Sequence, residues 1–506
     1  KTDYSIPDSM GILMTFKYDN VNLMDFQRID ELHDIGYNRT ISMMDSIKSR
    51  IHRRVNLDNI RLRRMVYHSN FPELRFKNII IDGANPQQQA YMKKEFHKSD
   101  NKEFTYEDLK QGYFRLLSDK MISEIIPHAI YNPEDDTYDL HLKVKLENNF
   151  AVRLGGNIST SNSNQIYLGL SYQDLNYYAK EFILDGQLGK VYNNVQFMAK
   201  IDFATAIPTS YRLIGSISTF DYFKKDKLFS RNNKPAFNQK DERFLKLQVG
   251  LPFLSSKRAE FGVGIARIED KYFQKSVIDF GNDKFDKSRY DLFGGSISFN
   301  GSTLNSKQYP TRGYREALVA QIFVGKERFY PGEGSTTSNN KDHHSWLQLS
   351  YMKEKYHNMS EHWVLGWYLK ALYASKNFSE NYTATMMQAG EFSPTLHSKL
   401  TYNEAFRANQ FVGAGIRPIY RLNQMFHLRG EFYGFMPIYP IEKNSLNKAY
   451  YGKAFSKFEY LGEISVVCQL PFGDISAYVN HYSSPKREWN VGLSIGLQLF
   501  NYRFIE

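Results

Sequence analysis

From about residue 149 to the C-terminus, short runs of alternating apolar and polar residues are separated by Gly, Asn, Asp, Ser and Lys. Alternation with a period of two is typical of a β-strand whose two faces meet different surroundings. In the last run one face is apolar throughout and the other is small or polar. No helical stretch here could supply a second apolar layer, so the polar face is expected to line a wet lumen. The apolar positions of this run are Trp489, Val491, Leu493, Ile495, Leu497 and Leu499.

Composition connects this pattern with a membrane. Aromatic residues make up 15% of the chain, with 36 Tyr and 37 Phe but 4 Trp, and interface girdles of a transmembrane barrel use such residues. No run reaches the roughly 18 apolar residues that a spanning helix needs, and open strands would leave backbone groups unpaired in lipid. The sequence therefore predicts a mainly β fold with a closed antiparallel barrel over residues 149–506. At roughly 22 residues per strand and connection, it has about 16 strands. A pair of soluble β-sandwiches is the alternative.

The first 70 residues have a different pattern, helical and basic. Apolar residues recur at helical spacing around Gly36-Tyr37, and an amphipathic helix of this kind must lie on another surface. The segment is too short to form a domain by itself, so residues 1–70 are expected to be the helical remnant of a larger domain and a linker.

Residues 71–148 predict a small α/β domain with the order strand, helix, helix, strand, strand. Asn85-Pro86 opens the first helix, with Asn as N-cap, and Thr105-x-x-Asp108 has the form of a capping box before the second. In the strand 138–146, leucines and a valine alternate with His and Lys, as in a half-buried strand.

This middle region resembles a POTRA domain, the periplasmic module that precedes barrels of the Omp85 superfamily. The resemblance rests on the element order and on the strand end Ile79-Ile80-Ile81-Asp82-Gly83. The region after it resembles the Omp85 (bacterial surface antigen) barrel, in which a Pro-x-x-Gly element opens a strand. Pro310 and Gly313, in Tyr309-Pro310-Thr311-Arg312-Gly313-Tyr314, correspond to that element.

Three further strings resemble the C-terminal part of patatin-like phospholipases of Bacteroidota, in which a lipid acyl hydrolase domain precedes POTRA and barrel. They are Phe392-Ser393-Pro394-Thr395, the stretch 406–411 and the stretch 415–420. Asp25-Phe26 through Ile35-Gly36-Tyr37 is similar to the family's closing helix after the hydrolase core. The resemblance implies hydrolysis of phospholipid acyl esters by a serine that lies outside this chain.

Omp85 barrels also carry an Arg-Gly-Phe/Tyr motif on a loop inside the lumen. Arg312-Gly313-Tyr314 matches it by letters, but about nine strands would still follow it, whereas the family has about four or five. Arg407 has the right position, although Ala408 and Asn409 depart from the motif. Arg407 is therefore the candidate for the lumen arginine, where a guanidinium could bridge to carboxylates of the wall. An ordinary loop arginine is the alternative.

Strings that look catalytic are expected to be structural. Gly492-Leu493-Ser494-Ile495-Gly496 reads G-x-S-x-G, but a nucleophile elbow needs a strand, a turn and a helix, and this string lies inside the last strand. Asp82-Gly83-Ala84 ends a strand before a helix, where a turn glycine belongs. His343-His344 lies in a polar stretch, 326–344, expected together with 224–241 to form outer loops. No catalytic residue, cofactor site or metal site is predicted, and the single Cys468 cannot form an internal disulfide.

The sequence thus predicts an outer-membrane barrel that anchors a patatin-like phospholipase, with its N-terminus and POTRA-like domain in the periplasm of a Gram-negative bacterium. The alternatives are an Omp85-type assembly or secretion factor, which works by strand pairing at a barrel seam, and a passive channel. Expected partners are outer-membrane lipids. The net charge of +11 is consistent with attraction to acidic headgroups or lipopolysaccharide phosphates, and solvated loops rich in Lys and Arg are the alternative explanation of that charge. Other outer-membrane proteins and a second copy of the chain are open alternatives, and no nucleic acid is expected.

Overall fold

The computed structural model describes residues 6–7, 11–14, 16, 29–51, 56–69, 71–96, 103–161, 164–204, 207–222, 238–254, 257–274, 284–333, 335, 338–484 and 489–506. The chain divides into two units, which are considered separately. One unit comprises residues 1–74 and 132–137, and the other comprises residues 75–131 and 138–506.

The N-terminal unit is helical, as the sequence predicts. Its helices are α1 (Ile29–Ser42), α2 (Met44–Arg50) and α3 (Leu57–Ser69). Neither α2 nor α3 has a buried residue, so these helices contribute no core of their own. Asp25 and Phe26, which belong to the resemblance at this end, lie outside the described residues. Within the described residues, none of the helices has the length and apolarity that crossing a membrane requires.

A small α/β domain follows, with the predicted order of elements and one addition. Its sheet has the order β2-β1-β4-β3, in which β1 and β4 are parallel. The addition is β2, a strand of two residues that the sequence did not predict and that pairs with the start of β1. The elements are β1 (Arg75–Asp82), α4 (Pro86–Lys94), β2 (Phe104–Thr105), α5 (Tyr106–Leu117), β3 (Ile122–Asn132) and β4 (Thr137–Leu146).

Helix capping and the alternation of apolar and polar residues along β4 explain why these elements form in this domain. Asn85 accepts a hydrogen bond from the Gln88 amide at 2.9 Å and Gln88 accepts one from Asn85, which completes a capping box at α4. The predicted capping box of Thr105 and Asp108 is present at α5. The alternating apolar residues of β4 are buried in the core. Gly83 has φ +89°, and a Cβ there would lie 2.1 Å from the Val144 carbonyl oxygen, so this turn requires glycine.

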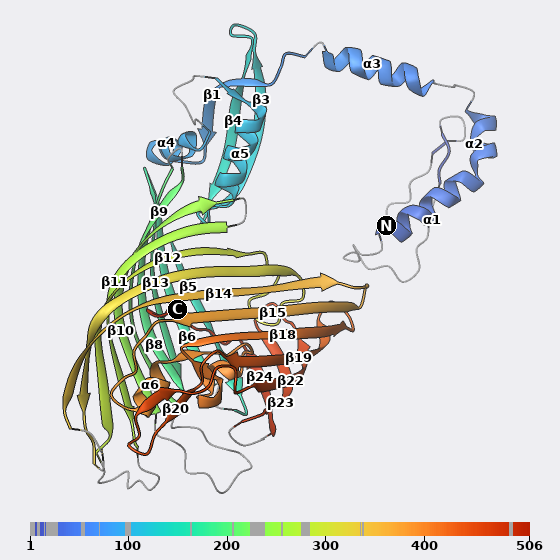
Figure 1. The fold of residues 1–506 in the computed structure, drawn as a ribbon. Helices are drawn as coiled ribbons and strands as arrows, with labels where there is room; N and C mark the ends of the chain where they lie inside the picture. Colours follow the sequence, from blue (N-terminus) through green and yellow to red (C-terminus); the bar gives the residue numbers. More distant parts are fainter. Residues whose placement is uncertain are drawn as a thin grey trace. The chain divides into compact units, whose positions relative to one another are not determined.

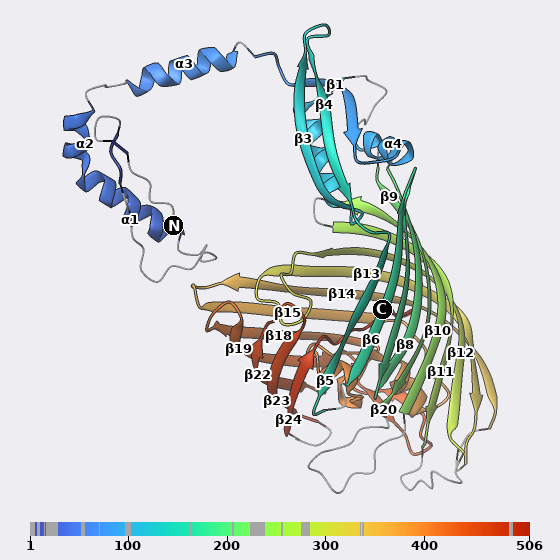
Figure 2. The same ribbon diagram turned by 180° about the vertical axis from the view of Figure 1, so that it is seen from behind.

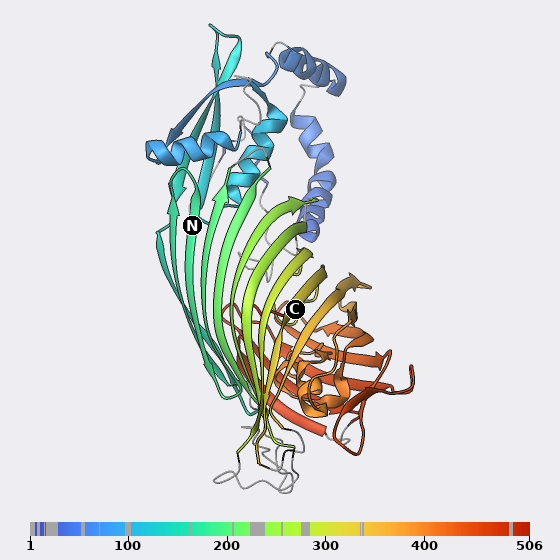
Figure 3. The same cartoon turned by 60° about the vertical axis from the view of Figure 1, so that its left-hand side comes forward.

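The predicted barrel is confirmed. In the described part of the chain, sixteen strands close into one antiparallel barrel, and Figure 1 shows them around a common interior. Figure 3 shows the green and yellow strands of one wall as tilted, curved ribbons lying side by side. The strands are β5 (Phe150–Ser159), β6 (Gln165–Leu175), β7 (Ala179–Gly189), β8 (Tyr192–Phe203), β9 (Thr209–Asp221), β10 (Asn238–Phe253), β11 (Lys257–Tyr272), β12 (Asp286–Ser302), β13 (Gly313–Tyr330), β14 (Asn340–Asn358), β15 (Trp363–Ala374), β18 (Gln410–Arg421), β19 (Phe426–Pro437), β22 (Glu459–Cys468), β23 (Asp474–Tyr482) and β24 (Trp489–Gly496).

Alternation places apolar side chains outside and polar ones inside. In β24, Trp489 and Val491 are 70% and 71% exposed on the outer face, whereas Ser494 is buried toward the lumen. A lipid-facing surface has this arrangement. The predicted extension of this apolar face to Leu497 and Leu499 is wrong, because β24 ends at Gly496 and both leucines are partly buried.

One of the two predicted outer loops is shorter than expected. Residues 326–330 belong to β13 and residues 340–344 to β14, so 331–339 alone connect these strands. The polarity of this stretch misled the prediction, because inward positions of a barrel strand are also polar. Of the other stretch, residues 238–241 belong to β10, and 224–237 lie outside the described residues.

Candidate functional site in the barrel lumen

A long loop between β15 and β18, residues 375–409, folds into the lumen. It contains α6 (Tyr382–Gln388), the short strands β16 (Gly390–Glu391) and β17 (Arg407–Ala408), and two single-turn helices. Its polar side chains bond to inward-facing residues of β11, β12 and β22, so the loop is fastened to both sides of the interior. The bonds are Asn381–Tyr272 at 2.7 Å, Gln388–Asp270 at 2.6 Å, Ser379–Tyr290 at 2.8 Å and His397–Glu463 at 3.0 Å.

Arg407 is a buried part of this lumen loop. Its guanidinium donates to Glu391 at 2.9 Å, lies over the ring of Tyr402 and donates to carbonyl oxygens of α6 and the residue after it. The sequence suggested a bridge from this arginine to a carboxylate of the wall. In the structure the carboxylate belongs to the loop itself, so Arg407 holds the loop in its folded form.

The charged cluster on the wall involves two other arginines, Arg417 of β18 and Arg429 of β19. Glu431 lies between them and accepts hydrogen bonds from Arg429 and Tyr433. Arg417 pairs with Glu354 of β14 and with Glu431 at 3.6 Å. The side chains of Arg417, Arg429, Glu431 and Glu354 are all at most 9% exposed. This cluster ties three strands together across the inside of the barrel.

Both arginines also reach loops that enter the lumen. Arg417 donates to the Pro394 carbonyl of the lumen loop at 3.3 Å, and Arg429 donates to the Pro310 carbonyl at 2.8 Å. Pro310 lies in the turn before β13, which begins at Gly313 with φ +91°. A Cβ at Gly313 would lie 2.1 Å from the Thr303 carbonyl oxygen, so glycine is required where this strand opens. The exposed Arg312 has no place in the cluster.

The last ten residues, 497–506, leave the wall and cross the lumen (the C-terminus is marked in Figure 1). Side-chain amides of wall residues form hydrogen bonds with the backbone of this segment, as a neighbouring strand would. Gln165 exchanges two hydrogen bonds of 3.0 Å with Leu499, and Gln321 exchanges two with Phe504 and Glu506. The ring of Phe504 packs against Phe244 and Phe323. This C-terminal segment therefore braces β6 on one side of the lumen against β13 on the other.

The seam between β24 and β5 is the weakest pairing of the wall. It has three residue pairs, Ser494–Ser159, Ile495–Ile158 and Gly496–Asn157, whereas the neighbouring β23–β24 pairing has eight. Figure 2 shows the two strands next to each other. In the described part of the chain, residues 150–155 of β5 pair with β6 alone. A strand edge without a partner can accept another strand.

The strings that look catalytic lie in structural positions. Ser494 is inside β24 and donates to Asn157 at 2.7 Å, and residues 497–506 after it contain no helix, so the nucleophile-elbow geometry is missing. Asp82 is the last residue of β1, and Gly83 lies in the turn between β1 and α4. His344 was expected to lie in an outer loop. In the structure it faces inward from β14 and contacts Glu327 at 2.8 Å. Among the described residues, no group of three His, Cys, Asp or Glu side chains could hold a metal ion.

Comparison with solved structures identifies the fold of the barrel. BamA from Haemophilus ducreyi lacking POTRA domains 1–3 superimposes with a TM-score of 0.57 at 12% identity, over 84% of this chain and 84% of that one. This match shows that the fold of the barrel is similar to that of BamA. CdiB from Acinetobacter baumannii (TM-score 0.49, 9% identity) and CdiB from Escherichia coli (0.47, 11%) each cover 84% of this chain and 74% and 76% of their own. No protein-family profile and no curated protein matches the sequence.

Of the buried residues in the lumen, Arg407 was singled out from the sequence, whereas Arg417, Arg429 and Glu431, which connect the wall to the loops inside it, were not. Arg429-x-Glu431-x-Tyr433 carried a signal, because residues two apart on a strand share a face and their neighbours Leu428 and Phe432 are apolar. Two charges at consecutive inward positions need partners in the lumen. The C-terminal segment had no such signal, because its alternation continues that of β24.

Proposed function

We propose that this chain is the membrane-anchoring half of an outer-membrane phospholipid acyl hydrolase. The observation that carries the proposal is the uncovered apolar surface of α3. Leu62, Met65 and Val66 share one face of that helix, and each is more than half exposed. Such a face is stable in a folded protein when another surface covers it.

The resemblance of residues 25–37 to the closing helix of a patatin-like hydrolase core indicates which domain would cover the N-terminal helices. Ile35 and Tyr37 of α1 are also exposed, in keeping with a partner surface along this unit. The reaction is hydrolysis of an acyl ester by an activated serine. Its catalytic residues are not among those of this chain, so residues 1–506 alone are expected to be inactive.

The barrel would place that hydrolase at its substrate. An outer face of Leu, Ile, Val and aromatic side chains suits the outer membrane, whose lipids are the proposed partners together with lipopolysaccharide phosphates. The α/β domain, as a POTRA-type module in the periplasm, would set the distance between the hydrolase and the inner leaflet. Neither other outer-membrane proteins nor a second copy of the chain is needed for this role.

The α3 face gives the first test. In the product of the whole reading frame, Leu62→Ser with Met65→Ser is expected to lower the melting temperature of the hydrolase domain by several degrees, because about 2–4 kcal/mol of apolar burial is lost. Release of fatty acid from labelled phosphatidylethanolamine vesicles should fall with it. The matched control is Arg63→Ser with Arg64→Ser on the same helix, which should change neither. A reading frame whose product releases no fatty acid would contradict the proposal.

Assembly or secretion of outer-membrane proteins is the second candidate, and the three-pair seam favours it. A client strand could pair with the free edge of β5 and add to the wall there. The passive channel has less support, because the lumen loop and the C-terminal segment both occupy the interior.

A disulfide that locks the seam distinguishes the assembly function from the anchor function. In a Cys468→Ala background, Ser159→Cys with Ser494→Cys places two thiols at facing positions across the β24–β5 seam. If the barrel assembles other proteins, oxidation should slow the folding of a client barrel into vesicles at least tenfold, and reduction should restore it. If the barrel is an anchor, lipid hydrolysis should not change on oxidation. The matched control is Ser476→Cys with Ser494→Cys, which bridges the ordinary β23–β24 pairing.

A further inference from the structure

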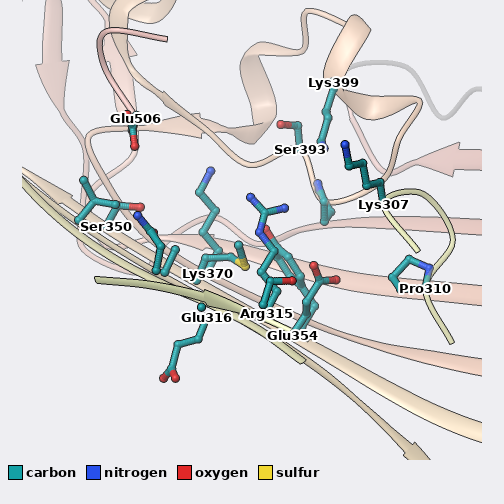
Figure 4. A pocket seen from close by; sticks show the side chains of 18 of the residues that line it. Lys307, Pro310, Arg315, Glu316, Ser350, Glu354, Lys370, Ser393, Lys399 and Glu506 are labelled. Carbon is teal, nitrogen blue, oxygen red and sulfur yellow. The ribbon is translucent and has the colours of Figure 1, made fainter. Parts of the chain in front are cut away.

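A cavity of about 930 Å³ lies in the lumen near the turn between β12 and β13. Residues of β9 to β15, β18, β19 and β22 line it, and the lumen loop and the C-terminal segment also contribute residues. Figure 4 shows Arg315 and Lys370 extending from the strands into this space, with Lys399 and Lys307 reaching toward it from loops. Its volume is that of a small-molecule site.

The carboxylates that line this lumen cavity already have partners. Glu316 lies on the other face of the wall, as Figure 4 shows, and contacts Lys257 at 2.6 Å. The inward-facing carboxylates are each paired with a basic side chain. These pairs are Glu260–Arg212, Glu354–Arg417, Glu431–Arg429, Glu463–His397 and Glu506–Lys246.

Four cations in the cavity are left over. Within the described residues, Arg315, Lys370, Lys399 and Lys307 have no carboxylate oxygen within 4.0 Å. Lys370 donates to the Glu391 carbonyl oxygen at 2.9 Å, which is a neutral acceptor. Burial and the nearby Arg315 guanidinium together lower the pKa of Lys399 to about 8. Like charges held together without an anion are unfavourable, so the cavity is suited to receive one.

We propose that this cavity binds a phosphate group, through Arg315, Lys370 and Lys399. Three cations from separate segments converge on one space, and a guanidinium fork with two ammonium groups suits the anionic oxygens of a phosphate group. A lipid headgroup and a soluble phosphate compound present the same group. The site is independent of the proposed function, because it needs neither a hydrolase domain nor a client strand.

Two probes distinguish a lipid headgroup from a soluble phosphate compound as the ligand of the cavity. The purified full chain in dodecyl maltoside is titrated with pyrophosphate by calorimetry, and binding of phosphatidylglycerol from mixed micelles is counted by native mass spectrometry, with diacylglycerol as the lipid that lacks phosphate. Binding of pyrophosphate supports a soluble ligand, and binding of phosphatidylglycerol without pyrophosphate supports a lipid headgroup. If neither phosphate compound binds, or diacylglycerol binds equally well, the proposal is wrong.

Variants that remove the positive charges test whether Arg315 and Lys399 bind the phosphate group. Arg315→Gln with Lys399→Gln is expected to weaken binding of whichever probe binds at least tenfold, because two charge-assisted contacts are lost. The matched control, Lys448→Gln with Lys453→Gln, removes the same charge from exposed positions outside the cavity and should change binding less than twofold. Lys399→Gln alone, on the loop, serves if the double variant does not fold. Equal loss in the control variant, or none in the cavity variant, would overturn the assignment.

Discussion

Replacing Glu431 with alanine is expected to destabilise the barrel by about 3–5 kcal/mol. Glu431 accepts from Arg429 and lies 3.6 Å from Arg417, and its removal leaves two buried guanidinium groups with less negative charge than they need. Breaking a buried ion pair on one side costs more than the pair itself contributes, because the remaining charge stays desolvated. The measurement is the urea concentration at which the folded barrel loses its faster mobility in unheated SDS gels.

Glu316→Ala is the matched control for that measurement. Glu316 also faces two cations, Lys257 at 2.6 Å and Lys353 at 3.3 Å, but it lies on the outer face and is 18% exposed. A partly exposed pair of this kind is worth about 0–1 kcal/mol. If the two variants unfold at the same urea concentration, the Arg417–Glu431–Arg429 cluster does not hold the wall in the way described.

Deleting residues 497–506 is expected to raise the single-channel conductance of the barrel about tenfold, because a barrel of sixteen strands is wide enough for an aqueous channel once its interior is cleared. The segment fills the space between β6 and β13 and its backbone uses the amide groups of Gln165 and Gln321. Without it, water and ions take its place. Conductance steps in planar lipid bilayers give the result directly.

A point variant keeps this test valid if the deletion does not fold. Phe504→Ala removes the ring that packs on Phe244 and Phe323 and should loosen the segment, giving frequent short openings. Tyr502→Ala in the same segment is the control, because Tyr502 is 43% exposed and should leave the conductance low. Unchanged conductance after the full deletion would mean that the lumen loop alone closes the barrel.

Local physical chemistry in the sequence was enough to predict the type of each region. A two-residue period between apolar and polar faces predicts strands with lipid outside and water inside, and the length of the region predicts about 16 of them. The capping boxes at Asn85 and Thr105 predicted where two helices begin, because a cap depends on residues three apart in the chain. These features depend on near neighbours, so they can be read without a structure.

The tertiary structure decided which distant residues meet. The alternation of β24 continues to Leu499, yet the chain leaves the wall at Gly496, whose φ of +120° permits the turn. The amide groups that receive the segment come from residues more than 180 positions away, such as Gln321 for Phe504. The same holds for the Glu354–Arg417 pair and for the short seam at Ser494. Pairing across a closed barrel depends on register and geometry, and no local pattern of the sequence encodes it.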